Sequence, residues 1–147
     1  MSDDAGSAGE CLFCGIVAGT VPSVTVLQEE AVVAFMDIDP GADGHLLVVP
    51  RRRSADLLSI PAEDLVATTL AAQRIAGGVR TAFGAEGVNL LNCSGTVAWQ
   101  TVFHFHLHVI PRYADRTRDR MQLPFEPGHP ADHEGLARRA RVLAAVL

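Results

Sequence analysis

Residues 104–112 read "HFHLHVIPR", and this stretch holds three of the six histidines of the chain. His104, His106 and His108 alternate with a phenylalanine and a leucine. Successive side chains of a β-strand point to opposite faces of a sheet. The pattern therefore predicts a strand that presents three imidazoles on one face and packs large apolar side chains into a core on the other.

The neighbouring segments predict the rest of a sheet. Residues 23–29 and 31–38 are rich in β-branched and aromatic residues, which predicts a hairpin. The continuous apolar run at 45–50 predicts a buried third strand. Residues 87–95 and 102–111 complete the set as the fourth and fifth strands.

Three helices are predicted around these strands. The apolar spacing at 11–18 indicates a short helix, and a long alanine-rich helix runs from Pro61 to about residue 83. A last helix begins at about Asp132. The expected fold is α+β, with a mainly antiparallel sheet of about five strands, one long helix and short terminal helices. A single domain is expected over 11–147, after a disordered tail at 1–10.

Composition excludes several classes of function. The chain has 147 residues, is 48% apolar and carries a net charge of −5, so neither nucleic acid nor an anionic membrane surface is expected as a partner. No apolar run reaches the roughly 20 residues of a membrane helix, and the acidic N-terminus indicates a cytoplasmic protein. All twelve basic residues are arginine. The absence of lysine excludes Schiff-base chemistry and a Walker A phosphate loop.

Three imidazoles on one face are compatible with two kinds of chemistry. Histidines two positions apart on a strand can ligate one metal ion. Alternatively, one imidazole acts as a nucleophile while its neighbours orient it and hold the charge of the group attacked. The local sequence leaves both open, although the nearest carboxylate, Asp115, falls in an expected loop.

Two longer segments resemble a known family. They are "NCSGTVAWQTVFHFHLHVIPR" at 92–112 and "CLFCGIVAGTVPSVTVLQEEAVVAFMDIDPGADGHLLVVPRR" at 11–52. Both are similar to the histidine triad family, whose signature alternates three histidines with apolar residues after Gln-Thr/Ser-Val. The resemblance runs in unbroken order over about residues 11–112, and it implies the histidine triad fold.

The resemblance implies a role for each matching residue. His106 corresponds to the nucleophile that attacks the α-phosphorus of a nucleotide, while its other ring nitrogen donates to the main-chain carbonyl of His104. His108 corresponds to the histidine that contacts the phosphoryl oxygens, and His45 to one that lines the same pocket. The substrate-binding residues implied are Asn92, Gln100 and Thr101 around the phosphate and leaving group, Asp37 at the ribose hydroxyls, and Phe13, Phe35 and Ile38 beside the base.

The implied activity is hydrolysis or transfer of a purine nucleotide. The Cys-x-x-Cys head is typical of the Hint-like branch, which acts on nucleoside phosphoramidates, whereas the triad segment equally suits the Fhit-like branch, which cleaves dinucleoside polyphosphates. The alternative is a nucleotide-binding regulator without turnover. No redox cofactor and no catalytic metal are expected. The resemblance also implies a homodimer that forms through the long helix and a neighbouring strand.

Two positions depart from the family pattern. Trp99 stands where the family often has glycine, which permits the close approach of main chain to a ligand. Cys11 and Cys14 match two zinc ligands of bacterial relatives, which the first triad histidine, here His104, and one further histidine complete. Arg53 occupies the position of that further histidine. The zinc site is therefore expected to be vestigial.

Overall fold

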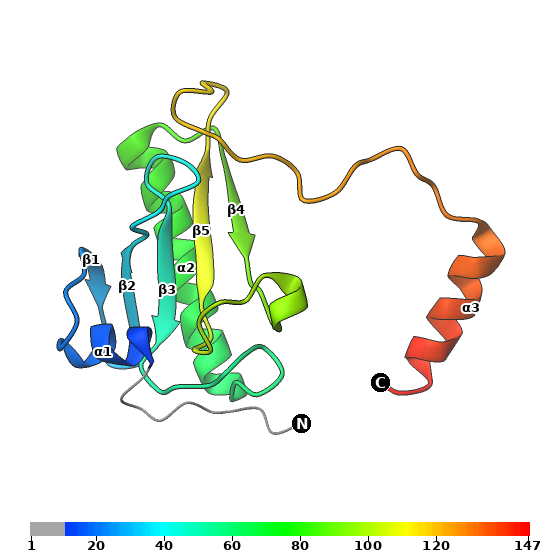
Figure 1. The fold of residues 1–147 in the computed structure, drawn as a ribbon, viewed down its shortest axis with the longest axis horizontal. Coiled ribbons are helices and arrows are strands. Elements are labelled where there is room, and N and C mark those ends of the chain that lie inside the picture. The colour runs from blue at the N-terminus through cyan, green and yellow to red at the C-terminus, as the bar shows by residue number, and fades with distance from the viewer. Residues whose placement is uncertain (1–10) are drawn as a thin grey trace.

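The structure is a computed structural model that describes residues 11–147, so the tail expected at 1–10 lies outside the described residues. Helices and strands follow one another as shown in Figure 1. Their order is α1 (Leu12–Ala18), β1 (Thr25–Gln28), β2 (Val32–Met36), β3 (Leu46–Pro50), α2 (Ala62–Phe83), β4 (Gly87–Leu91), the 3-10 helix η1 (Thr96–Ala98), β5 (Leu107–Arg112) and α3 (His133–Ala144).

The strands form one antiparallel sheet in the order β1-β2-β3-β5-β4. The last strand in the sequence, β5, is thereby inserted between β3 and β4. His108 lies opposite Leu47 on one side and Leu91 on the other, so this histidine stands inside the sheet rather than at its edge. The α+β fold with a five-stranded antiparallel sheet is confirmed.

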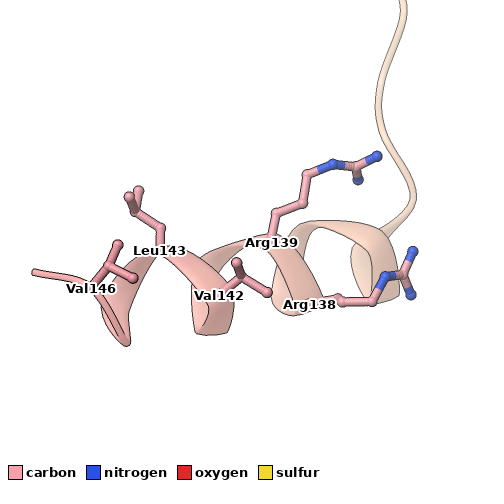
Figure 2. Close-up of a pocket in the computed structure, with 5 residues that line it drawn as sticks. All are labelled: Arg138, Arg139, Val142, Leu143 and Val146. Atoms are coloured by element: carbon pink, nitrogen blue, oxygen red, sulfur yellow. The ribbon is translucent and has the colours of Figure 1, made fainter.

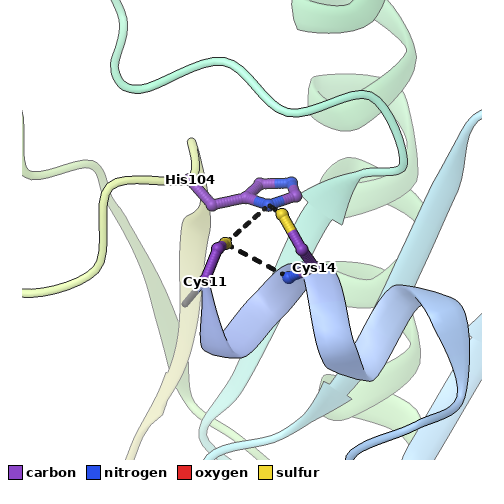
Figure 3. A group of neighbouring side chains, drawn as sticks. All are labelled: Cys11, Cys14 and His104. Atoms are coloured by element: carbon purple, nitrogen blue, oxygen red, sulfur yellow. Dashed lines mark hydrogen bonds between the residues drawn. The ribbon is translucent and has the colours of Figure 1, made fainter. Parts of the chain in front are cut away.

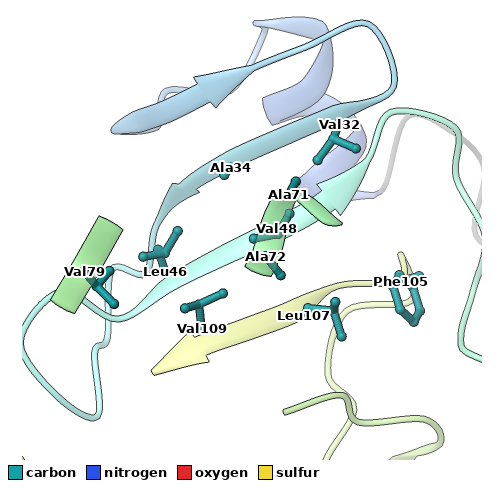
Figure 4. Packing of buried hydrophobic residues seen from close by; sticks show 10 residues of the cluster. All are labelled: Val32, Ala34, Leu46, Val48, Ala71, Ala72, Val79, Phe105, Leu107 and Val109. Atoms are coloured by element: carbon teal, nitrogen blue, oxygen red, sulfur yellow. The ribbon is translucent and has the colours of Figure 1, made fainter. Parts of the chain in front are cut away.

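Helix α2 covers one face of the sheet and closes the main core (Figure 4). Ala71 and Ala72 are completely buried, and their small side chains let the helix approach the strands closely. Burial of each large aliphatic side chain contributes about 1.5–3 kcal/mol. The strand residues beneath the helix are Val32, Ala34, Leu46, Val48, Leu107 and Val109, joined by Phe105.

Helix α1 lies on the opposite face of the sheet. Phe13 is its buried residue, and the ring of Phe13 meets that of Phe35 edge-on with centroids 5.4 Å apart. Since side chains alternate along a strand, the residues of β2 and β3 that α2 does not cover point to this second layer. His108 of β5, which lies opposite Leu47, points to the same side, and His106 packs against Phe13 there.

The fifth strand is shorter than predicted, because it begins at Leu107 instead of residue 102. His104 and His106 precede it, and the main chain of residues 104–106 bonds to groups outside the strands. Phe105 N donates to Ser54 O at 2.7 Å, and Asn92 Nδ2 donates to His106 O at 3.0 Å. The alternation of side chains nevertheless continues through this irregular segment, because Phe105 still packs under α2.

Helix α3 begins where the sequence predicted, with Asp132 as its N-cap. It lies at the end of an extended arm, apart from the sheet in Figure 1. Val142 and Leu143 of α3 and Val146 just beyond its end project beside two arginines (Figure 2), and each is more than half exposed. Within residues 11–147, no helix has the length and apolar character needed to cross a membrane.

Candidate active site

The ring of His106 is held in one tautomer by a main-chain contact. Its Nδ1 lies 2.7 Å from His104 O. A carbonyl oxygen can only accept a hydrogen bond, so the ring proton sits on Nδ1 and Nε2 keeps a lone pair. His106 is 5% exposed. The edge of Phe13 packs against it with centroids 5.0 Å apart and planes perpendicular.

A second main-chain contact fixes the tautomer of His45 and, through His45, the tautomer of His108. Gly41 N donates to His45 Nδ1 at 3.1 Å, so the proton of His45 sits on Nε2. That Nε2 lies 2.9 Å from His108 Nδ1, which must then accept. His108 consequently carries its proton on Nε2. The His106 and His108 rings are 5.1 Å apart, so a nucleophilic lone pair and an N–H donor lie side by side.

The four pocket histidines are neutral near pH 7. Burial lowers the pKa of His45, His104 and His106 below the ordinary value of 6.5. Burial, followed by the charges that His106 and His45 would carry, lowers the pKa of His108 to about 4. A neutral imidazole is the form that can act as a nucleophile.

Asp37 lies directly beside this group. It follows β2, and its main-chain N–H donates to His45 O across the β2–β3 hairpin at 3.1 Å. Its Oδ2 is 3.5 Å from His45 Nε2 and 3.9 Å from His108 Nδ1, while Oδ1 accepts from Asp39 N at 2.8 Å. The structure thus brings the predicted ribose ligand beside His45 and His108.

The predicted base-binding residues differ sharply in exposure. Phe13 and Phe35 are 6% and 3% exposed, which makes them the apolar floor under the histidines. Ile38, one residue beyond Asp37, is 95% exposed. Of these three side chains, Ile38 therefore has the surface available to contact a base.

The three residues predicted to lie around the phosphate and leaving group, Asn92, Gln100 and Thr101, differ in their contacts and exposure. Asn92 holds His106 O, and Ser94 Oγ donates to Asn92 Oδ1 at 2.8 Å. Gln100 is 3% exposed, and its amide bridges two loops. The contacts are Nε2 to Ala55 O at 2.7 Å, Nε2 to Val102 O at 3.2 Å and Oε1 from Gly95 N at 2.7 Å. Thr101 is exposed beside it.

Trp99 ends η1 with φ at 70°, the only positive φ of a non-glycine residue within the described chain. This left-handed conformation is readily adopted by glycine but is strained for a large side chain. The family's preference for glycine at this position thereby has a main-chain reason. The indole itself is 62% exposed.

Cys11, Cys14 and His104 come together at the start of α1 (Figure 3). His104 Nδ1 lies 3.6 Å from Cys11 Sγ and 3.5 Å from Cys14 Sγ. Its Nε2 donates to Pro50 O at 2.7 Å, so Nδ1 offers a lone pair to a metal or to the thiols. Burial, followed by the neighbouring Cys11 thiol, raises the pKa of Cys14 to about 11.

These three groups fit three positions of a tetrahedral zinc site, but Arg53 does not fit the fourth. Arg53 Nε donates to Phe103 O at 3.0 Å, and its charge acts to lower the pKa of both Cys14 and His104. A permanent cation whose charge acts on two of these ligands opposes a divalent ion there. The described residues therefore supply three ligands and a repulsive charge.

The triad histidines do not converge on a common metal position. Among the described residues, the three-ligand clusters are the cysteine group with His104 and the group of Asp37, His45 and His108. His104 belongs to one and His108 to the other. The geometry favours a nucleophilic imidazole over a single metal held by all three triad rings.

Sequence reasoning overlooked two residues that shape this site. Gly41 fixes the tautomer of His45, and Ser94 orients Asn92. The Asn-Cys-Ser order at 92–94 was a usable signal, since a serine two residues from an asparagine can reach its side chain. The contact of Gly41 has no such local signature.

The buried sheet and the histidine pocket define the class of protein. The family model described as the HIT domain matches residues 18–115, and the chain belongs to this histidine triad family. It is 33% identical over 117 residues to the adenosine 5′-monophosphoramidase of Saccharomyces cerevisiae, an alignment that covers 80% of this chain and 72% of the relative.

Solved structures agree with the fold. A crystal structure of a HIT family member from Bacillus subtilis matches with a TM-score of 0.86 at 34% identity, covering 94% of this chain and 97% of that one. A zinc-bound histidine triad protein from Mycobacterium smegmatis matches with a TM-score of 0.73 at 32% identity, covering 95% and 99%. Family membership supports nucleotide binding or hydrolysis at the level of the family.

Proposed function

We propose that this protein is a nucleotide hydrolase or nucleotidyl transferase in which His106 attacks the α-phosphorus of a nucleotide. The contact that carries the proposal is the hydrogen bond from His106 Nδ1 to His104 O at 2.7 Å. It leaves Nε2 as the free nucleophile. It also places a carbonyl dipole against the ring, where positive charge appears when Nε2 becomes bonded to phosphorus.

The neighbouring groups suit the remaining requirements of the reaction. His108 offers an Nε2–H donor for the phosphoryl oxygens, whose negative charge grows in the transition state. The first step forms the Nε2–P bond and breaks the bond from phosphorus to the leaving group. In the second step, water or another acceptor attacks phosphorus, the Nε2–P bond breaks, and the nucleotide is released.

The substrate is expected to be bound by its ribose and base. Asp37, whose carboxylate lies beside His45 and His108, is assigned to the ribose hydroxyls, while Ile38 contacts the base above the floor formed by Phe13 and Phe35. None of these apolar side chains selects one base by hydrogen bonding. Tolerance between purines is therefore expected.

The experiment is a turnover screen that compares adenosine 5′-phosphoramidate with diadenosine polyphosphates, each with and without a chelator. Because a relative of this chain is the yeast adenosine 5′-monophosphoramidase, we expect the phosphoramidate to be the better substrate. Cleavage that persists in chelator supports the histidine mechanism, whereas cleavage that chelator abolishes supports a metal at Asp37, His45 and His108. Tight binding of AMP without turnover of either substrate class would support the nucleotide-binding regulator instead.

A further inference from the structure

The turn that follows β5 packs against the loop that carries His45. This turn comprises residues 113–121, and the loop comprises residues 40–45. The two segments lie at the same end of the sheet (Figure 1). Two main-chain hydrogen bonds join them, from Asp43 N to Arg118 O at 2.8 Å and from Arg120 N to Gly41 O at 3.0 Å.

A buried carboxylate organises this turn. Asp119 is 1% exposed, and its Oδ2 accepts from Arg112 Nε at 2.7 Å and from Tyr113 N at 3.1 Å. Its Oδ1 accepts from Met121 N at 2.9 Å. Burial alone would raise the pKa of Asp119, but these hydrogen bonds outweigh it and lower the pKa to about 2. The carboxylate is therefore charged, and it ties the end of β5 to both ends of the turn.

The turn reaches the histidines through Gly41. Gly41 N donates to His45 Nδ1, and a Cβ placed on Gly41 would lie 2.4 Å from Met121 Sδ. Met121 therefore rests directly on this glycine. The position of the Gly41 N–H, and with it the hydrogen bond from His45 to His108, depends on where the turn places Met121.

We propose that Asp119 is a positioning residue for the histidine pocket, acting through Met121 and Gly41 to hold His45 and His108 with their protons on Nε2. Asp119 lies beyond residues 18–115, which the family model matches. The inference rests on the proposed function in one respect, namely that His108 Nε2–H donates to the phosphoryl oxygens during the reaction. The hydrogen-bonded chain itself can be measured without a substrate.

The decisive measurement is NMR of the ligand-free protein labelled with ¹⁵N. An N–H···N hydrogen bond couples its two nitrogens, so the native protein should show couplings from Gly41 N to His45 Nδ1 and from His45 Nε2 to His108 Nδ1. In Asp119→Asn, an amide with one oxygen cannot accept all the donors that the carboxylate satisfied. Both couplings should weaken or vanish.

Two internal controls separate positioning from general loosening. The ring ¹⁵N shifts of His104 and His106 should stay native in Asp119→Asn, because Pro50 O and His104 O set those tautomers. Asp115→Asn removes a charge from the same turn, but the Asp115 side chain bonds only Thr117 at the surface. This variant should keep both couplings.

A second pair of variants keeps the test decisive if Asp119→Asn does not fold. Gly41→Ala pushes a methyl group against Met121 and should weaken both couplings, and the added substitution Met121→Ala should restore them by making room. In turnover, Asp119→Asn and Gly41→Ala should each lower kcat, by no more than the roughly 10²–10³-fold cost of removing a transition-state donor altogether, with little change in KM.

The inference is overturned if Asp119→Asn and Gly41→Ala both retain native couplings, or if the His104 and His106 shifts change together with those of His45. Native couplings in a protein without turnover would contradict the proposed function and leave this inference intact. Turnover through His106 with no coupling between Gly41 and His45 in the native protein would contradict only the inference.

Discussion

At the residue scale, Asp37 is expected to contribute to substrate binding and not to the chemical step. It stands beside the histidines without reaching His106, so we expect Asp37→Asn to raise KM for nucleotides and leave kcat nearly unchanged. Native protein should bind a 2′,3′-dideoxynucleotide more weakly than the ribonucleotide by about 1–3 kcal/mol, as for hydrogen bonds to a charged group. Equal affinities in calorimetry would remove Asp37 from the ribose site.

The pH dependence also belongs to individual residues. Only neutral His106 is a nucleophile, and its lowered pKa means that the neutral form persists below pH 6.5. The acidic limb of kcat/KM, which reports the free enzyme, should therefore lie below pH 6.5. A profile recorded from pH 4 to pH 8 tests this expectation. A limb at or above pH 6.5 would show that the pocket does not depress the pKa of the nucleophile.

At the element scale, the start of α1 decides the metal content of the protein. Two thiols and His104 converge there, and Arg53 opposes a divalent ion. Protein purified without added metal should contain well under one zinc per chain by elemental analysis. Arg53→His should raise both zinc content and thermal stability, because a ligand that binds the folded state stabilises it. Arg53→Gln removes the charge without adding a ligand and serves as the matched control.

Stoichiometric zinc in the native protein would contradict this expectation. It would mean that another group completes the coordination shell despite Arg53, because structural zinc requires four ligands. An Arg53→His variant that gains no zinc would equally contradict it, since the three remaining ligands already lie within 4.8 Å of one another.

The sequence predicted those elements whose cause is local. The β-branched runs predicted β1 and β2, the continuous apolar run predicted β3, and Asp132 marked the start of α3. The start of β5 was misplaced because residues 104–106 keep the alternation of histidine and apolar side chains, while their main chain bonds to groups outside the strands. Periodicity reports which side chains face the core, but it does not report which main-chain groups find a strand partner.

The residues of the site also fall into those that the sequence identified and those that it did not. The triad histidines, His45 and Asp37 were identified by resemblance. The structure places His106, His108, His45 and Asp37 together, whereas the His104 ring contacts Cys11 and Cys14. Gly41 and Asp119 were not identified, because Gly41 acts through its main-chain N–H and Asp119 acts largely on the main-chain N–H groups of Tyr113 and Met121. Neither kind of contact leaves a pattern in a single sequence.

At the scale of the whole molecule, the homodimer remains an expectation, for which exposed apolar side chains offer a surface. Val66 and Leu70 on α2 and Leu90 on β4 are about half exposed, on the helix and strand through which pairing was expected. We expect native protein to sediment as a dimer at micromolar concentration and Leu70→Arg to shift it towards monomer. Leu58→Arg, in a loop where leucine is 90% exposed, is the control that should remain dimeric. A monomeric native protein would contradict the expectation.

The most direct test of the account is to trap the covalent intermediate on His106. Native protein quenched during turnover of a labelled adenosine phosphoramidate should carry one nucleotidyl group, which peptide mass spectrometry locates on His106. His106→Gly should fold normally, carry no label and lose on the order of 10³-fold or more in kcat/KM. His129→Ala, which replaces an exposed histidine outside the pocket, should behave as the native protein does. Label on another residue, or an His106→Gly variant that keeps most of its activity, would contradict the mechanism.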